Sequence, residues 1–225
     1  MHVLDIATGT GLAAAAALAA VGSTGSVFAA DVSAAMVEQA GRRLGSRPNV
    51  SVAVEDGQSL SFADGRFDAL ICSLGLMFFP DAARGVSEFR RVLRPGARAA
   101  ASVLTVPERS YNGRINAVIA RHVPSLAEAI TRTFLLGDTA RLRSLFEAAG
   151  FRDVEITTEI HRFQLPSFDA YFGPFERGGG STGQAYVTLP EMVRGAVREE
   201  MRRSLGDTGG PIEIEVEFRF ASGQR

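Results

Sequence analysis

A glycine-rich turn near the start of the chain limits what this sequence can fold into more than any other feature. Val3–Ile6 is predicted to be a short strand, Ala7–Gly11 a turn with two glycines, and Leu12–Ala20 an alanine-rich helix. A glycine turn between a strand and a helix lets a ligand approach the backbone at the carboxyl end of a parallel sheet. The segment therefore predicts an α/β fold with a ligand site at this turn.

Short β-branched runs alternate with helical runs over the first two thirds of the chain, as in βαβ units that build a parallel sheet. Ser33 is placed to cap a helix that runs to about Leu44, and Gly150 is placed to end a later helix. The further predicted strands are Ser26–Ala30, Val50–Val54, Phe67–Ser73, Ala97–Val106, Phe151–His161 and Ile212–Phe220. The further predicted helices are Asp81–Leu93, most of Tyr111–Leu136, Thr139–Ala149 and Pro190–Leu205, with a glycine-rich loop at Gly178–Gly183.

The last predicted strand, Ile212–Phe220, alternates apolar and charged residues. This pattern is typical of a half-exposed strand near a sheet edge. A strand in that place could pair with a second copy of the chain, so it favours a homodimer.

Composition excludes several classes of protein. No apolar run reaches the roughly 18 residues of a membrane span, and the N-terminus lacks the pattern of a signal peptide. The net charge of −1, without a basic run, gives no indication of nucleic-acid binding. All 24 basic residues are arginine, which excludes lysine Schiff-base chemistry, and one cysteine (Cys72) with three histidines forms no zinc-type cluster. We therefore expect a cytoplasmic protein of 225 residues without a metal.

Three aspartates decide between two kinds of ligand. Gly9–Ala14 also satisfies the G-x-G-x-x-G/A fingerprint of dinucleotide sites, and Asp31 lies where a ribose-binding acid belongs. However, the Asp5 carboxylate beside the turn would repel a pyrophosphate, whereas it would attract the ammonium and sulfonium groups of S-adenosylmethionine (SAM). Asp31 could hold the ribose hydroxyls and Asp56 the adenine amino group. A single aspartate at a strand end is often only a turn former, but three at successive strands indicate a nucleoside site.

The segment Val3–Leu104 resembles the class I SAM-dependent methyltransferases, close to the ubiquinone/menaquinone-biosynthesis C-methyltransferases. The first motif of that family matches Asp5–Gly11, its ribose-binding strand end matches Asp31–Ser33, and its adenine site matches Glu55–Gly57. The fourth-strand motif and the turn before the fifth strand match Gly65–Asp68 with Cys72–Asp81, and Arg90–Gly96. The region after Pro107 fits the family only loosely.

The resemblance implies a single methyltransferase domain over residues 1–225, with a SAM-binding half at 1–106 and acceptor-side insertions at 107–138 and 162–210. Its fold would be α/β: a doubly wound, mostly parallel, Rossmann-like sheet of seven strands in the order 3-2-1-4-5-7-6, with the last strand antiparallel. The cofactor-binding residues implied are Asp5, Ala7, Thr8, Gly9, Gly11, Asp31, Val32, Met36, Asp56, Gly57, Gln58 and Ser73.

The acceptor side is less defined by the sequence. The resemblance implies that the loop Ser73–Phe79 faces the reacting methyl group, with Met77 and Phe78 in the substrate pocket, although core packing is the alternative for both. Tyr111 and His122 are further candidates, although a position on a helix surface explains His122 better. No spacing dictates a general base, and methyl transfer from a sulfonium needs mainly positioning and exclusion of water.

We therefore expect a SAM-dependent methyltransferase acting on a small-molecule acceptor, with quinone-like or other aromatic acceptors favoured by the resemblance. A non-catalytic SAM-fold module and an NAD(P)-dependent oxidoreductase are the alternatives. Asp5 and the absence of a Tyr-x-x-x-Lys motif argue against the oxidoreductase. Members of the family usually carry several dozen residues before the first strand, which cover the cofactor. Because this chain begins at Met1–His2, we expect weak SAM binding and slow turnover.

Overall fold

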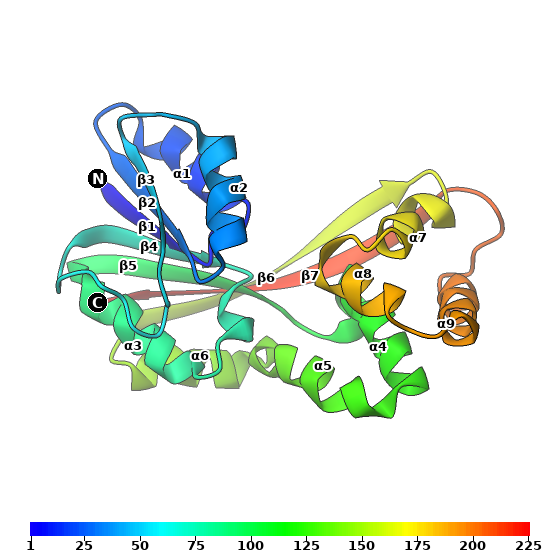
Figure 1. Cartoon of the computed structure of the whole chain (residues 1–225). Coiled ribbons are helices and arrows are strands. Elements are labelled where there is room, and N and C mark those ends of the chain that lie inside the picture. The colour runs from blue at the N-terminus through cyan, green and yellow to red at the C-terminus, as the bar shows by residue number, and fades with distance from the viewer. The chain divides into compact units, whose positions relative to one another are not determined.

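The computed structural model describes all of residues 1–225 (Figure 1). Its strands are β1 (His2–Ile6), β2 (Ser26–Asp31), β3 (Val50–Val54), β4 (Phe67–Ser73), β5 (Leu93–Leu104), β6 (Arg152–Leu165) and β7 (Ile212–Gln224). Its α-helices are α1 (Leu12–Val21), α2 (Ala34–Leu44), α3 (Ala82–Val92), α4 (Gly113–His122), α5 (Ala127–Thr133), α6 (Thr139–Ala148), α7 (Phe168–Glu176), α8 (Gly180–Val187) and α9 (Glu191–Ser204). Short 3-10 helices are η1 (Leu76–Phe78), η2 (Pro107–Arg109), η3 (Pro124–Leu126) and η4 (Leu135–Gly137).

All seven strands belong to one sheet, in the order β3-β2-β1-β4-β5-β7-β6. Strands β1 to β5 pair in parallel, so that Ile6 lies opposite Ala30 and Asp31 opposite Val54. β7 is antiparallel, and the Arg225 N–H donates to the Ala97 carbonyl (2.8 Å) where β7 meets β5. The predicted strand order and antiparallel last strand are confirmed. The parallel pairing also brings the residues that follow β1, β2, β3 and β4 to one edge of the sheet.

The chain divides into two compact units. Unit 1 comprises Met1–Val103, Leu136–Thr157 and Arg219–Arg225, and unit 2 comprises Leu104–Leu135 and Thr158–Phe218. Unit 1 holds β1 to β5 with α1, α2, α3 and α6, while unit 2 holds α4, α5, α7, α8 and α9. None of the helices has both the length and the apolar character needed to cross a bilayer.

In unit 1, helices pack on both faces of the sheet. On one face, α1 and α2 bury an apolar cluster with β1 and β2 that includes Val3, Leu18, Val27 and Leu44. On the other face, α3 and α6 bury a larger cluster with the neighbouring side chains of the strands, among them Leu4, Leu70, Phe89 and Phe146. Strands that are covered on both faces need apolar residues at successive positions, which explains why these strands are almost continuously apolar.

The glycine turn fixes where α1 begins. Gly11 has a φ of +81°, which side-chain-bearing residues rarely adopt. A Cβ at this position would lie 3.2 Å from the Ala40 Cα and 3.3 Å from the Ala40 Cβ in α2. Glycine at this position therefore permits both the turn and the close approach of α1 to α2.

Both predicted helix-end residues are confirmed. The Ser33 hydroxyl accepts a hydrogen bond from the Met36 N–H (3.4 Å) at the start of α2. Gly150 follows α6 with a φ of +87°, the left-handed conformation that commonly ends a helix.

The predicted glycine-rich loop at Gly178–Gly183 is wrong in its second half, and α7 was not predicted at all. Gly180 begins α8, and a Cβ at Gly183 would lie 2.7 Å from the carbonyl carbon of Gly178. The glycine at position 183 is thus explained by close packing rather than by a loop. The aromatic side chains of α7, including Tyr171 and Phe172, form the buried core of unit 2.

The predicted position of Ile212–Phe220 near one edge of the sheet is confirmed. β7 lies between β5 and β6, and the edge strand is β6. The alternation of β7 is that of a half-exposed strand, as predicted: within unit 2, Ile214 and Val216 are buried in the apolar cluster, whereas Glu213 and Glu215 pair with Arg162 of β6. However, both sides of β7 are already paired with strands of this chain. The argument for a homodimer through this strand therefore loses its basis.

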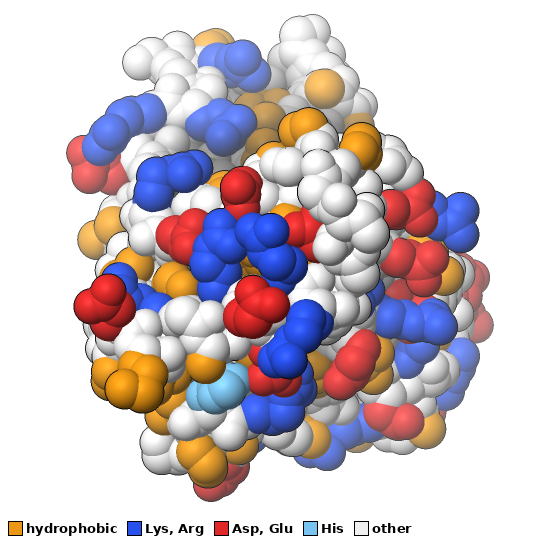
Figure 2. Space-filling model, turned by 90° about the vertical axis from the view of Figure 1, so that its right-hand side faces the viewer, with side chains coloured by type: hydrophobic (Ala, Val, Ile, Leu, Met, Phe, Trp, Pro, Cys, Tyr) orange, Lys and Arg blue, Asp and Glu red, His pale blue; other side chains and the backbone are white.

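The charged side chains of unit 2 form ion pairs. Arg198 of α9 donates to Asp169 (2.6 Å) and Glu176 (2.8 Å), and its guanidinium lies 5.2 Å from the ring centre of Phe168. His122, a candidate acceptor-side residue, pairs with Glu200 (2.8 Å). Figure 2 shows basic and acidic side chains interleaved on one face of the molecule. The helix-surface interpretation of His122 fits these contacts.

Truncation of the buried α3 side chain tests the core of unit 1. Phe89 is completely buried, so we expect Phe89→Ala to lower the free energy of unfolding by about 3–5 kcal/mol through lost burial and a residual cavity. Chemical denaturation with urea measures this change. Met192→Ala is the control, because Met192 is 87% exposed; an equal loss in both variants would contradict the assignment of the core.

Candidate cofactor site

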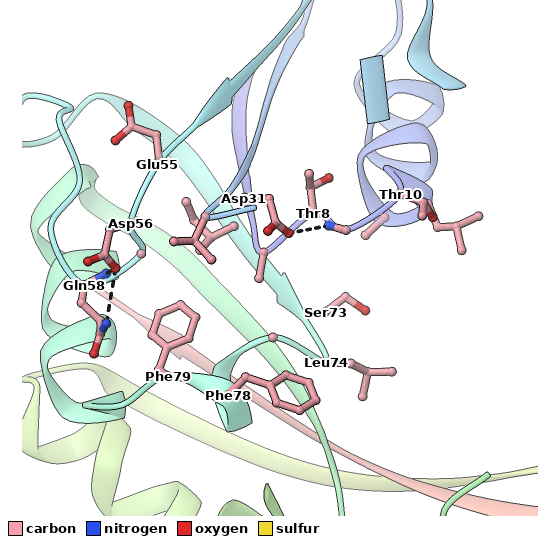
Figure 3. A pocket seen from close by; sticks show the side chains of 18 of the residues that line it. Thr8, Thr10, Asp31, Glu55, Asp56, Gln58, Ser73, Leu74, Phe78 and Phe79 are labelled. Atoms are coloured by element: carbon pink, nitrogen blue, oxygen red, sulfur yellow. Dashed lines mark hydrogen bonds between the residues drawn. The ribbon is translucent and has the colours of Figure 1, made fainter. Parts of the chain in front are cut away.

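A cavity of about 630 Å³ lies where β1, β2, β3 and β4 end (Figure 3). Its lining comes from the glycine turn after β1, from Asp31 and Val32 after β2, from residues 55–58 after β3, and from residues 73–75 and 78–80 after β4. Its volume lies in the range of small-molecule and cofactor sites. All of these residues belong to unit 1.

Asp31 connects the glycine turn to the start of α2. Its Oδ2 accepts a hydrogen bond from the Gly9 N–H (2.9 Å), and its Oδ1 accepts one from the Ser33 N–H (2.9 Å). The side chain is only 9% exposed, yet it lines the cavity. A carboxylate has about four lone-pair positions, so each oxygen keeps one for a ligand hydroxyl.

Asp5 lies beneath the glycine turn rather than in the cavity. It is completely buried, and its Oδ2 accepts a hydrogen bond from the Thr8 hydroxyl (2.6 Å). Its Oδ1 has no hydrogen-bond partner. Burial raises the pKa of Asp5 from the usual 3.8 to about 6, although the Thr8 hydrogen bond acts in the opposite direction. Asp5 therefore does not line the cavity, whereas Thr8, whose hydroxyl donates to Asp5, does line it.

The loop after β3 supplies the second polar wall. The Asp56 Oδ1 accepts hydrogen bonds from the backbone N–H (2.9 Å) and the side chain (3.3 Å) of Gln58. Gln58 in turn accepts one from the Asp81 N–H (2.7 Å). A Cβ at Gly57 would lie 2.4 Å from the Phe79 ring, so glycine is required for the loop to pack against that ring.

The opposite wall is apolar and follows β4. Leu74 has a φ of +56°, an unfavourable conformation for a leucine, and its N–H donates to both the carbonyl and the hydroxyl of Ser102 (3.1 Å each). Phe78 lines the cavity and is 63% exposed, and Leu12 from α1 is also an exposed apolar lining residue. Strained backbone of this kind is concentrated at functional sites, where the surrounding structure holds it in place.

The structure brings most of the predicted cofactor residues together. Nine of them line the cavity, namely Ala7, Thr8, Gly9, Asp31, Val32, Asp56, Gly57, Gln58 and Ser73. Three do not: Asp5 is buried below the turn, Gly11 packs against α2, and Met36 lies on α2.

The two predicted pocket residues Met77 and Tyr111 lie elsewhere. Met77 packs against the core of unit 1, in agreement with the core-packing alternative. Tyr111 belongs to an aromatic cluster of unit 2, where its ring centre lies 5.0 Å from that of Tyr171 and 5.6 Å from that of Phe163. Of the three predicted substrate-pocket residues, Phe78 alone lines the cavity.

Sequence reasoning missed several lining residues, including Thr10, Leu12, Ala13, Glu55 and Pro80. Thr10, Leu12 and Ala13 stand inside or next to the glycine motif, and Glu55 next to Asp56, so their spacing could have identified them. The lone cysteine is not part of the site: Cys72 is buried, and burial raises the pKa of its thiol to about 12.

The donor set of the cavity fits SAM better than a dinucleotide. No arginine or histidine lines the cavity, so a pyrophosphate would meet no side-chain cation. Asp31 and Asp56 are placed for a ribose and an adenine, and the buried carboxylate of Asp5 favours a cationic ligand nearby. The exposed N-terminus of α1, at Leu12 and Ala13, suits an anionic group of either ligand and does not distinguish between them.

Replacing the buried Asp5 tests how much its negative charge lowers the free energy of unfolding. Well below pH 3.8 the carboxyl group is protonated in both the folded and the unfolded chain, and Asp5→Asn should change the stability little. As the pH rises from 3.8 toward 6, the unfolded chain releases this proton before the folded chain does, so the wild type loses stability that the variant keeps. We expect Asp5→Asn to be more stable than the wild type at pH 7.5 by on the order of 3 kcal/mol.

Urea unfolding at a series of pH values measures this difference. Glu199→Gln is the control, because Glu199 is an exposed acid on α9. A stability difference for Asp5→Asn that does not change between pH 4 and pH 7.5 would contradict the electrostatic explanation.

Comparisons with known proteins show similarity to methyltransferases. Residues 3–96 match a family described as methyltransferase domain. A demethylmenaquinone methyltransferase of Clavibacter sepedonicus is 34% identical over 170 residues, which are 68% of this chain and 66% of that protein. The ubiquinone/menaquinone biosynthesis C-methyltransferase of Citrobacter koseri is 30% identical over 171 residues, which are 68% of this chain and 67% of that protein. The chain thus spans slightly less than two thirds of the Clavibacter relative.

Among solved structures, a phosphoethanolamine N-methyltransferase 2 of Haemonchus contortus in complex with phosphomonomethylethanolamine and S-adenosylhomocysteine superimposes with a TM-score of 0.62. The match covers 100% of this chain and 49% of that one. At a sequence identity of 17%, the match is evidence of a shared fold alone. The sheet order, the sequence similarity and the matched domain lead to the same assignment. The chain belongs to the class I SAM-dependent methyltransferases of the ubiquinone/menaquinone type.

Proposed function

We propose that this chain transfers the methyl group of SAM to a ring carbon of a quinone-like small molecule. The observation that carries the proposal is one cavity with two aspartates on its polar wall and exposed apolar side chains on the other. When bound, SAM would supply a methyl group on a sulfonium: a nucleophile attacks the methyl carbon in line, the carbon–sulfur bond breaks, and S-adenosylhomocysteine leaves. The names of the relatives, demethylmenaquinone methyltransferase and C-methyltransferase, support the choice of acceptor.

The polar wall would hold the nucleoside. Asp31 would accept the two ribose hydroxyls with the lone pairs that Gly9 and Ser33 leave open. Asp56 would accept from the adenine amino group, and the Gly57 N–H would lie near a ring nitrogen. Because two backbone N–H groups already orient the Asp31 carboxylate, little conformational freedom is lost on binding.

The apolar wall would position the acceptor and exclude water. Leu74 and Phe78 are the side chains proposed for this role, because both line the cavity after β4. No histidine, tyrosine or lysine lines the cavity, so no general base of these types is available there. The residues of this wall would therefore act through orientation and desolvation.

The proposal treats residues 1–225 as one methyltransferase domain in which segments 107–138 and 162–210 serve the acceptor. The aromatic core of unit 2, with its buried α7, is a framework suited to that role. A cytoplasmic location belongs to the same proposal and is supported by the free, buried thiol of Cys72.

Removing the carboxylates of the polar wall tests the cofactor assignment. We expect Asp31→Asn and Asp56→Asn each to weaken SAM binding about 10- to 100-fold, because a hydrogen bond to a charged group contributes about 1.5–3 kcal/mol. Isothermal titration calorimetry with SAM measures this loss, and NADH serves as the competing ligand. Glu38→Gln, on the exposed face of α2, should bind SAM like the wild type. Binding of NADH in place of SAM would refute the proposal.

Methyl transfer itself is tested with radiolabelled SAM. We expect label to enter a demethylated naphthoquinol, and Phe78→Ala to raise the KM of that acceptor several-fold while the affinity for SAM stays unchanged, since Phe78 is placed on the acceptor wall. Binding of SAM without label transfer to the naphthoquinol or to any component of a metabolite extract would instead favour a non-catalytic SAM-binding module.

A further inference from the structure

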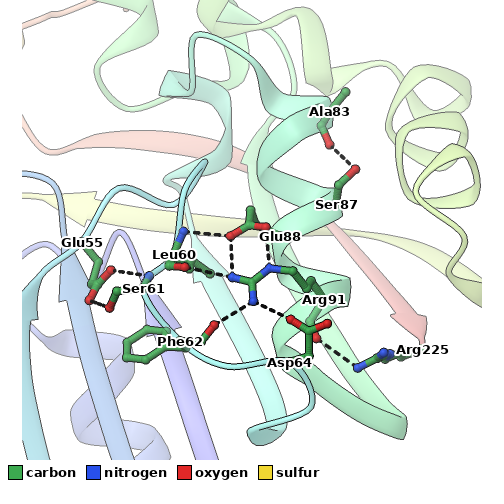
Figure 4. A network of polar contacts seen from close by, with 10 residues as sticks. All are labelled: Glu55, Leu60, Ser61, Phe62, Asp64, Ala83, Ser87, Glu88, Arg91 and Arg225. Carbon is green, nitrogen blue, oxygen red and sulfur yellow. Dashed lines mark hydrogen bonds and ion pairs between the residues drawn. The ribbon is translucent and has the colours of Figure 1, made fainter.

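The part of the polar wall that contains Asp56 belongs to a loop without regular secondary structure. Residues 55–66 connect β3 to β4, and only isolated turns interrupt them. The first four, from Glu55 to Gln58, line the cavity. An irregular segment of this length needs contacts from outside to keep one conformation. Figure 4 shows where those contacts come from: Arg91, near the end of α3, lies at their centre.

All five N–H groups of the Arg91 guanidinium have an acceptor. Two go to backbone carbonyls of the loop, those of Leu60 (2.9 Å) and Phe62 (2.7 Å), and one goes to the Asp64 carboxylate (2.7 Å). The remaining two bind both carboxylate oxygens of Glu88 (2.7 and 2.8 Å). A guanidinium has five N–H donors, so none is left unused.

Further hydrogen bonds fix other parts of the same loop. The Glu88 Oε2 also accepts from the Leu60 N–H (2.8 Å), and the Arg91 carbonyl accepts from the Gly65 N–H (3.0 Å). At the cavity end, Glu55 accepts from both the N–H (3.0 Å) and the hydroxyl (2.5 Å) of Ser61. Asp56 and Gly57 therefore lie between two fixed points, Glu55 on one side and Leu60 on the other.

The geometry requires an arginine. The acceptors, two carbonyls and two carboxylates, surround the three nitrogens of the planar guanidinium. A lysine carries the same charge, but its three donors sit on a single nitrogen, which cannot reach all of these acceptors. The hydrogen bonds to Glu88 and Asp64 raise the pKa of Arg91 above its usual value, so the group stays charged at any pH at which the protein is folded.

We propose that Arg91 is a positioning residue that fixes the adenine-binding wall of the cavity and thereby sets the selectivity for adenine over other purines. This inference rests on the proposed function, because it takes Asp56 and Gly57 as the adenine contacts. Arg91 touches neither the cavity nor the ligand; it acts through the loop backbone. Loss of Arg91 should reduce the preference for adenine over other bases while leaving the ribose contact of Asp31 in place.

The test compares two ligands that differ only in the base. Calorimetry with S-adenosylhomocysteine and S-inosylhomocysteine measures the preference for adenine, whose amino group the inosine compound lacks. We expect the wild type to prefer the adenosine compound by at least about tenfold, as for a lost hydrogen bond to a carboxylate. In Arg91→Lys and Arg91→Gln this ratio should fall below about threefold.

Controls separate positioning from general damage. Arg90→Gln changes the neighbouring arginine of the same helix, whose side chain donates to the Gly150 carbonyl (3.0 Å) and not to the loop, and its ratio should equal that of the wild type. Glu88→Gln keeps the arginine but weakens the hydrogen bonds from Arg91 and Leu60 to residue 88, so we expect an intermediate ratio. This variant also provides a test if the Arg91 variants fail to fold. Hydrogen exchange of the amides in residues 57–64 should quicken in the variants that lower the ratio.

The outcomes distinguish this inference from the function beneath it. If the wild type binds neither compound, the proposed function fails and the inference fails with it. If the wild type prefers the adenosine compound and every folded variant, including Glu88→Gln, keeps that preference, then Arg91 has no part in base selectivity and only the inference is overturned.

Discussion

The end of β2 holds the cofactor cavity together. The carboxylate of Asp31 accepts the backbone N–H of Gly9 in the turn after β1 and that of Ser33 at the start of α2. Its backbone carbonyl accepts the N–H of Glu55 after β3 (3.1 Å). One residue therefore connects three of the chain segments that form the site. Since parallel strands end at one sheet edge, a single short side chain there can reach several of them.

The electrostatics of the site follow from this arrangement. Asp31 and Asp56 line the cavity, Asp5 is buried directly below it, and no basic side chain faces them. The negative charge of Asp31 itself contributes to the raised pKa of Asp5. A cationic ligand would relieve this repulsion, whereas an anionic one would add to it. The charges of the site, as well as its hydrogen-bond acceptors, therefore favour a cationic ligand over an anionic one.

The sequence predicted the sheet and most of the polar wall, because those features depend on local patterns. Strand runs, the glycine turn and Asp31 all follow from spacing along the chain. The errors arose where tertiary packing decides. Asp5 was placed in the cavity because sequence cannot show that the turn folds over it, and Gly183 was assigned to a loop although it permits helix packing. The contacts of the Arg91 guanidinium were equally hidden, because their partners lie up to 31 residues away.

The packing of Phe79 limits how this protein can vary. Two glycines from different segments face the same ring: a Cβ would lie 2.4 Å from it at Gly57 and 2.5 Å at Gly85. A larger residue at either position requires a smaller one at position 79. Residues 57, 79 and 85 should therefore covary, rather than change independently, among homologues of this protein.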